Sequence, residues 1–292
     1  MRKWIYVASL VLLTLSSCQQ KQNTLIIFHA GSLSIPFQEL ADTFELHHSD
    51  IRVQLEADGS VACARKITEL NRKADIMASA DIKIINKMLI PEYADSAIAF
   101  AGNEMVIAFH ENSTAHDTIN AINWPGILLN PDIRYGRSNP DLDPCGYRTV
   151  LVMKLQEKYI TNQHFVKKLL NKDKRYIRPK ETDLLALLET NTIDYMFIYK
   201  SVAQQHNLKW IELQPKVNLS SEAYTDAYQS VSIDIKGNSP EDTLTISGSP
   251  MTYGICKLKN APNTKAAEEF IQLLLSKKGQ KIITNNGQNS LL

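Results

Sequence analysis

Short apolar runs alternate with amphipathic segments through the first third of the chain. The apolar runs have the length and residue content of buried strands, and the segments between them place apolar residues at helical spacing. The predicted strands lie at residues 24–30, 51–57 and 74–80, and the predicted helices at 34–48, 60–73 and 81–90. This strand–helix order predicts a parallel sheet covered by helices.

The same alternation continues less regularly along the rest of the chain. Further strands are predicted at 104–110, 132–138, 192–199, 208–213 and 249–259, and further helices at 146–160, 164–171, 183–191 and 199–207. Residues 214–250 are richer in Pro, Ser, Asn and Thr and have no clear period. Residues 263–283 predict one long terminal helix, with Asn263 as its N-cap.

This order of elements predicts an α/β protein with two lobes, each a mostly parallel sheet flanked by helices. We expect residues 24–103 plus 234–292 to form the first lobe and residues 104–233 to form the second. The last strand and the terminal helix are assigned to the first lobe because the chain is expected to return to it.

The first 17 residues differ from the rest. A basic start at Arg2 and Lys3 precedes an uncharged apolar stretch that is too short to span a bilayer comfortably and suits an export signal. The sequence "LSSC" that ends at Cys18 resembles a lipoprotein cleavage box. This implies a signal peptide at 1–17, lipid on Cys18, a tether at 18–23 and a membrane-anchored, periplasmic or extracytoplasmic location. The alternative is an ordinary signal peptide that ends near a cysteine.

Composition narrows the function classes. The chain has 292 residues, 44% hydrophobic and 22% charged, with a formal net charge of +1 and no basic block. A nucleic-acid partner is therefore not expected. Beyond Cys18, the cysteines are odd in number, widely spaced and never paired as CxxC, which supports neither a disulfide framework nor a structural zinc site: Cys63, Cys145 and Cys256.

Small and polar residues stand where several predicted helices begin. They are Gly31 and Ser32, Gly59 and Ser60, the "DPCG" stretch at 143–146, Glu181 and Thr182, and Tyr199. Helix starts carry unpaired N–H groups and partial positive charge, so several that converge make a site for an oxyanion. Each one alone is more simply a helix cap. Spacing therefore leaves the anion site open.

Long motifs at these helix starts resemble one family. The segments "IIFHAGSLSIPFQEL", "EADGSVACARKITELNRKADIMASAD", "NPDLDPCGYRT", "RPKETDLLALLE" and "IDYMFIYKSVAQQHNLKWIEL" are similar to archaeal-type tungstate/molybdate-binding proteins. These proteins are the extracytoplasmic substrate-binding components of ABC importers. The resemblance runs from about residue 24 to the C-terminus. It implies a type II periplasmic-binding fold with the ligand in the cleft between the lobes.

The resemblance also implies a set of oxyanion-binding residues: Gly31, Ser32, Ser60, Asp143, Pro144, Cys145, Glu181 and Tyr199. Pro144 and Cys145 would act through their backbone, and Asp143 and Glu181 would approach the tungsten or molybdenum atom itself. Sulfur and phosphorus in their oxyanions do not expand their shell, so we hypothesise that the two acids select against sulfate and phosphate by repulsion. No cofactor and no catalysis are implied. The expected partners are a permease with its ATPase, and the expected state is a monomer.

Other functions remain open from the residues alone. Cys145 at a helix start could act as the nucleophile of a hydrolase, although no histidine stands at a recognisable spacing. The same fold could hold sulfate or phosphate, or a cation between Asp143 and Glu181, although a cation normally collects more oxygen ligands. A sensing or scaffold lipoprotein without an importer is a further alternative.

Several neighbouring residues have simpler interpretations. His29 is expected to be a core or loop histidine, and Asp81 a cap or sheet-edge residue. Tyr147 and Cys63 are expected in the core: neither is assigned to the site. Arg148 either adds positive potential near the anion or forms an ion pair, and Asp141 has no assigned role: both remain undecided.

Overall fold

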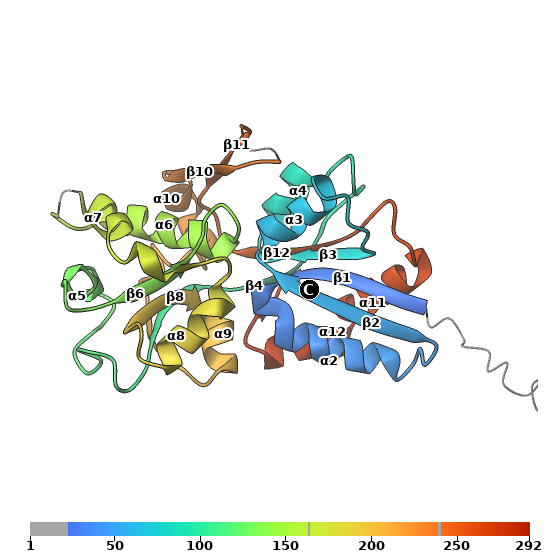
Figure 1. Cartoon of the computed structure of the whole chain (residues 1–292), viewed down its shortest axis with the longest axis horizontal. Helices are drawn as coiled ribbons and strands as arrows, with labels where there is room; N and C mark the ends of the chain where they lie inside the picture. The colour runs from blue at the N-terminus through green and yellow to red at the C-terminus, as the bar shows by residue number, and fades with distance from the viewer. Residues whose placement is uncertain (1–22, 163, 239–240) are drawn as a thin grey trace, which may run out of the picture.

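The computed structural model describes residues 23–162, 164–238 and 241–292. The predicted signal peptide at 1–17, Cys18 and the tether up to residue 22 lie outside the described residues. Two helix-flanked sheets lie side by side, and a two-stranded ribbon lies above the line between them in Figure 1.

The first sheet has six strands in the order β13-β4-β12-β3-β1-β2. The strands are β1 Asn23–Ala30, β2 Ile51–Asp58, β3 Ile76–Ser79, β4 Ile98–Gly102, β12 Thr252–Lys257 and β13 Asn289–Ser290. Its helices are α2 Ser34–Glu45, α3 Ser60–Thr68, α4 Ile82–Met88, α11 Thr264–Leu275 and α12 Lys277–Asn285, with the 3-10 turn η2 Gly31–Leu33.

The second sheet has five strands in the order β7-β6-β8-β5-β9. The strands are β5 Met105–Phe109, β6 Tyr135–Ser138, β7 Ile177–Arg178, β8 Tyr195–Tyr199 and β9 Lys209–Glu212. Its helices are α5 Trp124–Leu129, α6 Pro144–Glu157, α7 Phe165–Asn171, α8 Leu185–Glu189, α9 Lys200–Gln205 and α10 Thr225–Gln229, with the 3-10 turns η3 Lys174–Tyr176, η4 Glu181–Leu184 and η5 Glu222–Tyr224.

Both sheets are mixed, and most strands of each run in one direction, as expected. Strands β2, β1 and β3 run parallel, as do β7, β6 and β8. Strand β12 returns late in the chain and inserts between β3 and β4 in the opposite direction. Strand β5 is likewise antiparallel to both of its neighbours. The sequence periods show which residues form strands but carry no information on the direction of a strand that returns from far along the chain.

The predicted terminal helix is two helices. Ser276 ends α11 in an extended conformation (φ −70°, ψ 162°), and its hydroxyl accepts a hydrogen bond from Gly279 N at 3.2 Å to begin α12. A Cβ on Gly279 would lie 2.1 Å from Leu273 O, so the break needs glycine there. The predicted cap Asn263 is confirmed, since its Oδ1 accepts from Ala266 N.

Residues 214–250 are also more regular than expected. They contain α10 and a ribbon of β10 Ser232–Lys236 antiparallel to β11 Thr243–Ser247. The predicted boundary between residues 233 and 234 falls inside β10, and the division of the chain into lobes at these residues stays a prediction. The other predicted boundary lies between β4 and β5, where Asn103 Nδ2 donates to Ser201 Oγ at 2.7 Å and to Tyr253 OH at 3.1 Å.

The central strands are buried along their whole length. Strands β5 and β8 have no exposed residue, which is typical of strands covered on both faces. Trp124 packs edge-on against Phe165 and Phe197 in the core of the second half. In the described part of the chain, no helix has the length and apolar content needed to cross a membrane.

Candidate functional site

The predicted helix starts converge where loops from the two sheets meet. A Cβ built on Gly31 would lie 3.3 Å from both carboxylate oxygens of Glu181. A Cβ on Gly59 would lie 2.3 Å from Leu142 O, and Ala62 N donates to that same oxygen at 3.1 Å. The approach at Gly59 needs glycine, and the approach at Gly31 leaves little room for a side chain. The loops before α2 and α3 therefore touch the starts of η4 and α6.

All the predicted binding residues are buried at this junction: Gly31, Ser32, Ser60, Asp143, Pro144, Cys145, Glu181 and Tyr199. They come from five helix starts on two sheets, which the sequence separates by up to 168 positions. We infer from the contacts of Gly31 and Gly59 that the structure brings the predicted set together.

Asp143 fixes two helix starts at once. It is the N-cap of α6, where its Oδ1 accepts from Cys145 N at 3.3 Å. Its Oδ2 accepts from Glu181 N at 3.1 Å at the start of η4. Pro144 occupies the first turn, where its missing N–H costs nothing. The cap predicted at this position therefore also sets the position of Glu181.

Glu181 is buried beside Asp143, and the two carboxyl groups interact directly. The Glu181 side chain is 1% exposed, and neither of its carboxylate oxygens has a hydrogen-bond donor outside the pair among the described residues. Burial, and then the adjacent Asp143 carboxylate, raises the pKa of Glu181 well above its usual range. The pKa of Asp143 is also raised, because burial outweighs the contacts that favour its charged form. Two acids held together in this way cost free energy unless a ligand accepts their lone pairs.

Three hydroxyl groups surround the acids as acceptors from the protein. Ser32 Oγ accepts from Tyr253 OH at 3.0 Å, and Ser60 Oγ accepts from Ala80 N at 3.0 Å. Tyr199 OH accepts from an Arg148 N–H at 3.0 Å, and burial raises the pKa of Tyr199 well above its usual range. Each hydroxyl therefore keeps its own hydrogen, which is available to donate to an oxyanion.

Cys145 lacks the environment of a nucleophile. It is fully buried, and its Sγ donates to Phe197 O at 3.7 Å. Burial, and then the Asp143 and Glu181 charges, raises the pKa of the Cys145 thiol well above its usual range. Catalytic cysteines need a lowered pKa, so the geometry disfavours the hydrolase alternative.

The interpretations of the neighbouring residues are largely confirmed. His29 is 1% exposed, its Nδ1 is 2.9 Å from Ala30 O, and burial lowers its pKa to about 4, as expected of a neutral core histidine. Cys63 and Tyr147 are fully buried. Asp141, which had no assigned role, accepts from Lys236 N at 3.0 Å and so anchors the ribbon.

Arg148 and Ser138 are two further buried polar residues near the site. Arg148 is 2% exposed and forms an ion pair with Asp81, with Nη2 to Oδ2 at 3.2 Å. Ser138, at the end of β6, is fully buried. Its Oγ has no hydrogen-bond partner of normal geometry among the described residues. The Ser138 hydroxyl nevertheless lies close enough to Asp143 to oppose the rise in the pKa of Asp143. The sequence feature that points to Ser138 as a site residue is its place at the carboxyl end of a parallel strand, where α/β sheets bind ligands.

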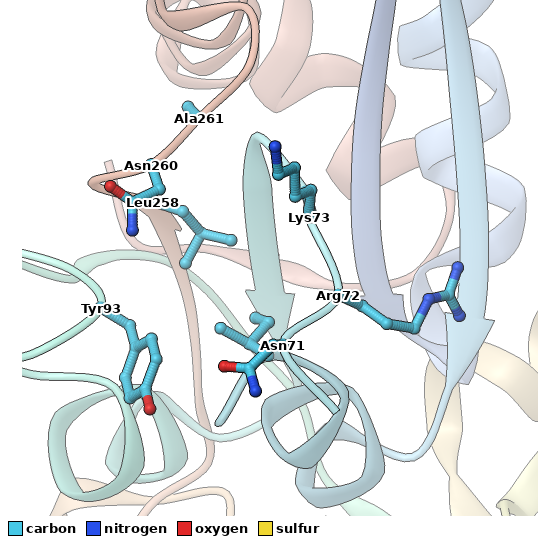
Figure 2. Close-up of a pocket in the computed structure, with 9 residues that line it drawn as sticks. Asn71, Arg72, Lys73, Tyr93, Leu258, Asn260 and Ala261 are labelled. Atoms are coloured by element: carbon cyan, nitrogen blue, oxygen red, sulfur yellow. The ribbon is translucent and has the colours of Figure 1, made fainter. Parts of the chain in front are cut away.

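The open cavities lie elsewhere. One of about 510 Å³ has no predicted binding residue at its border and is lined by Ile67, residues 71–74, Tyr93, Leu258, Asn260 and Ala261 (Figure 2). Another, of about 550 Å³, lies beside Asn103 and Gln288 where the chain passes between the sheets. Among the described residues, no group of three or more His, Cys, Asp or Glu side chains comes together to hold a metal ion.

Comparisons with known proteins test the predicted resemblance. The family model for bacterial extracellular solute-binding proteins matches residues 25–288. The molybdate/tungstate-binding protein WtpA of Pyrococcus abyssi is 44% identical over 299 residues, which cover 93% of this chain and 86% of that protein. The predicted resemblance to tungstate/molybdate-binding proteins is confirmed.

Solved structures of lower identity have the same fold. The periplasmic molybdate-binding protein of Azotobacter vinelandii superposes with a TM-score of 0.66 at 16% identity, covering 92% of this chain and 99% of that one. The sulfate-binding protein SubI of Mycobacterium tuberculosis H37Rv superposes with a TM-score of 0.64 at 11% identity, covering 92% of this chain and 87% of that one. The predicted two-lobed, type II periplasmic-binding fold is confirmed. The chain belongs to the bacterial extracellular solute-binding protein family.

Proposed function

We propose that this chain binds molybdate or tungstate between its two lobes and delivers it to an ABC importer. The observation that carries the proposal is Glu181: a buried carboxylate with no donor partner among the described residues, held against Gly31 and beside Asp143. The names of relatives such as WtpA support the same ligand class. The fold alone does not select the ligand, because a sulfate-binding protein shares it.

The two acids favour a metal-centred oxyanion over sulfate. An ionised carboxylate repels a dianion, and at the short distances of a dry site this repulsion amounts to several kcal/mol. Tungsten(VI) and molybdenum(VI) can accept carboxylate oxygens into an expanded shell, so the same acids attract them. Sulfur(VI) and phosphorus(V) in their oxyanions do not expand in this way. The Asp143–Glu181 pair would then supply both binding and selectivity.

The hydroxyl and backbone donors would hold the ligand oxygens. Ser32 and Ser60 approach from the side of the six-stranded sheet. The backbone at 144–145 and the Tyr199 hydroxyl approach from the side of the five-stranded sheet. Ligand entry would separate these two sides and binding would bring them together, as in hinge closure of such proteins.

The remaining parts of the proposal concern the setting of this binding. Lipid on Cys18 would hold the chain at the membrane, on the outer side where export delivers it. The closed, monomeric protein would dock on a permease, whose ATPase drives release. Export is consistent with the family to which the chain belongs.

Calorimetric titration of the mature chain with tungstate, molybdate, sulfate and phosphate tests the proposal. We expect tight binding of the first two and weak or absent binding of the others. Glu181→Gln should weaken tungstate binding by about 100-fold, since an anionic ligand of the metal is lost (about 2.7 kcal/mol). Glu189→Gln, at an exposed position on α8, is the matched control. Sulfate binding as tight as tungstate binding would overturn the role of the acids.

A further inference from the structure

Arg148 lies at the centre of a buried hydrogen-bond network between the two sheets. Its Nη1 donates to Ala80 O at 2.7 Å and to Tyr199 OH at 3.0 Å. Its Nη2 pairs with Asp81 Oδ2 at 3.2 Å. Asp81 Oδ2 also accepts from Tyr147 OH at 2.7 Å. The four side chains and the Ala80 carbonyl are almost fully buried, so these contacts are shielded from water.

The network joins two of the hydroxyls described above. The backbone of Ala80 contacts both Ser60 and Arg148. Its N–H donates to Ser60 Oγ, and its carbonyl accepts from Arg148. Arg148 in turn donates to Tyr199 OH. Ser60 begins α3 beside the six-stranded sheet, and Tyr199 ends β8 of the five-stranded sheet. One guanidinium therefore connects hydroxyls from opposite sides of the junction.

We propose that Arg148 is a positioning residue that orients the Tyr199 hydroxyl for the oxyanion only when the two sides are in contact. This inference rests on the proposed function. Arg148 and Tyr199 belong to one side, whereas Ala80 and Asp81 belong to the other. Separation of the sides removes the Ala80 and Asp81 contacts and frees the guanidinium to turn away from Tyr199.

The chemistry of the phenol explains how this orientation works. A tyrosine hydroxyl has one hydrogen and accepts through its oxygen. When Arg148 donates to that oxygen, the hydroxyl hydrogen is directed elsewhere and is free to donate to the ligand. Donation from a cation also polarises the phenol and strengthens its own hydrogen bond. Lysine has the charge but not the planar fork that reaches Ala80 O, Tyr199 OH and Asp81 together.

A double-mutant cycle separates positioning from charge. We expect Arg148→Lys to weaken tungstate binding by about 10-fold or more, the size of one lost charge-assisted hydrogen bond. Tyr199→Phe should have a similar effect. The double variant should be no weaker than the weaker single variant, because both changes remove one function. Arg52→Lys, at an exposed position on β2, is the control for the substitution itself.

Asp81→Asn provides a second test if Arg148→Lys folds poorly. Asparagine keeps the N-cap of α4 but loses the charge that fixes Arg148. We expect weaker tungstate binding that is again non-additive with Tyr199→Phe. Thermal unfolding of each variant shows that the folded protein is being titrated.

The outcomes distinguish this inference from the proposed function. Failure of the wild-type chain to bind tungstate or molybdate would overturn the proposed function. Normal wild-type binding with an unimpaired Arg148→Lys variant would overturn only the role of Arg148. Effects of Arg148→Lys and Tyr199→Phe that multiply would also overturn positioning, since they would show that the two residues act independently.

Discussion

Two buried polar clusters lie at the same junction between the sheets, and they are built in opposite ways. The acid pair of Asp143 and Glu181 buries two carboxyl groups together, which raises the pKa of Glu181, and neither Glu181 oxygen has a donor outside the pair among the described residues. The arginine cluster places Arg148 against Asp81 and satisfies the charges with Tyr147, Tyr199 and the Ala80 carbonyl. Both clusters are almost fully buried, so the difference between them is whether their polar groups have hydrogen-bond partners.

This difference separates a ligand site from a structural contact. Buried polar groups in folded proteins are normally paired, and an unpaired one stores free energy that a ligand can recover. A satisfied cluster mainly fixes the relative position of the segments that form it, and in the arginine cluster only the Tyr199 hydroxyl hydrogen is left for a ligand. We therefore expect substitutions in the acid pair to change ligand affinity most, and substitutions in the arginine cluster to change stability most.

Asp143→Ala is expected to have the largest effect, because Asp143 belongs to the acid pair and also caps α6. Loss of the carboxylate removes a proposed metal-directed oxygen and the acceptor for Cys145 N and Glu181 N. Tungstate affinity should fall by about 1,000-fold, or about 4 kcal/mol, by calorimetry. The free energy of unfolding should fall by about 1–2 kcal/mol through the lost cap. Asp132→Ala, at an exposed position, is the control; an unchanged affinity in Asp143→Ala would remove Asp143 from the site.

Asp81→Asn breaks the satisfied cluster. It leaves the buried Arg148 guanidinium without its ion-pair partner, which costs about 3 kcal/mol in the free energy of unfolding of the ligand-free protein. Urea unfolding monitored by circular dichroism measures this change. The control is Asp95→Asn, which breaks the exposed pair with Lys259 (3.1 Å) and should cost under about 0.5 kcal/mol. Equal losses for the two variants would show that the arginine cluster contributes no more than a surface ion pair.

The contrast between these clusters could be predicted only in part from the sequence. The strands and helices follow from local periods, and Gly31, Ser32, Ser60 and Asp143 stand at helix starts that motifs reveal. From the sequence, Arg148 either adds positive potential or forms an ion pair, and Asp81 is a cap or a sheet-edge residue. Their contact depends on how α6 packs against the turn after β3. Tyr147 and Asp81, which bond to each other, are 66 residues apart. Local sequence carries no signal for such a contact.

The unpaired state of Glu181 was also beyond the sequence. The motif indicated a glutamate at a helix start, where a carboxylate normally accepts backbone N–H groups. In the structure Asp143 takes the Glu181 N–H instead, and Gly31 closes over the Glu181 carboxylate. Solvent exclusion and the absence of donors among the described residues are properties of the packed junction.

Glu181→Gln is expected to stabilise the ligand-free protein at neutral pH while it weakens tungstate binding. The folded-state pKa of Glu181 is raised above the ordinary value of about 4.3, so its stabilising contribution is complete below that pH and is lost as pH rises through the raised pKa. The free energy of unfolding should therefore rise by about 1–2 kcal/mol in the variant at pH 7. The difference from wild type should shrink as the pH approaches about 4.

Wild type and Glu181→Gln are compared at each pH because His29 changes the free energy of unfolding with pH in the opposite direction. The pKa of His29 is lowered to about 4, so its contribution to the free energy of unfolding is complete above about pH 6.5 and is lost as the pH falls toward 4. His29 is common to both proteins, so its effect cancels in the difference. Thermal unfolding between pH 4 and 8 gives the comparison. A Glu181→Gln variant that is less stable than wild type at pH 7 would show that the acid pair is satisfied in the ligand-free protein.

The contacts that hold the ribbon of β10 and β11 are of a third kind. A substitution in these contacts is expected to have the smallest effect on stability and affinity. Arg65 on α3 donates to Asp141 O at 3.1 Å, to Lys236 O at 2.6 Å and to Gly237 O at 3.0 Å. Lys154 on α6 donates to Ser232 O at 2.5 Å, so cationic side chains from both halves hold backbone carbonyls of the ribbon. These bonds are partly exposed and are worth less than those of the buried clusters.

Arg65→Met should therefore loosen the ribbon without disturbing the acid pair. We expect the free energy of unfolding to fall by about 1 kcal/mol and tungstate affinity to change by less than about 3-fold. Hydrogen exchange should accelerate in residues 232–236 and 243–247 while the amides of α6 stay protected, because the ribbon opens locally. Arg52→Met on the exposed edge of β2 is the matched control. A large loss of tungstate affinity in Arg65→Met would show that the ribbon belongs to the binding site together with the acid pair. Arg65 bonds the carbonyl of Asp141, two residues before Asp143, so the loss of this bond would then affect the ligand through Asp143.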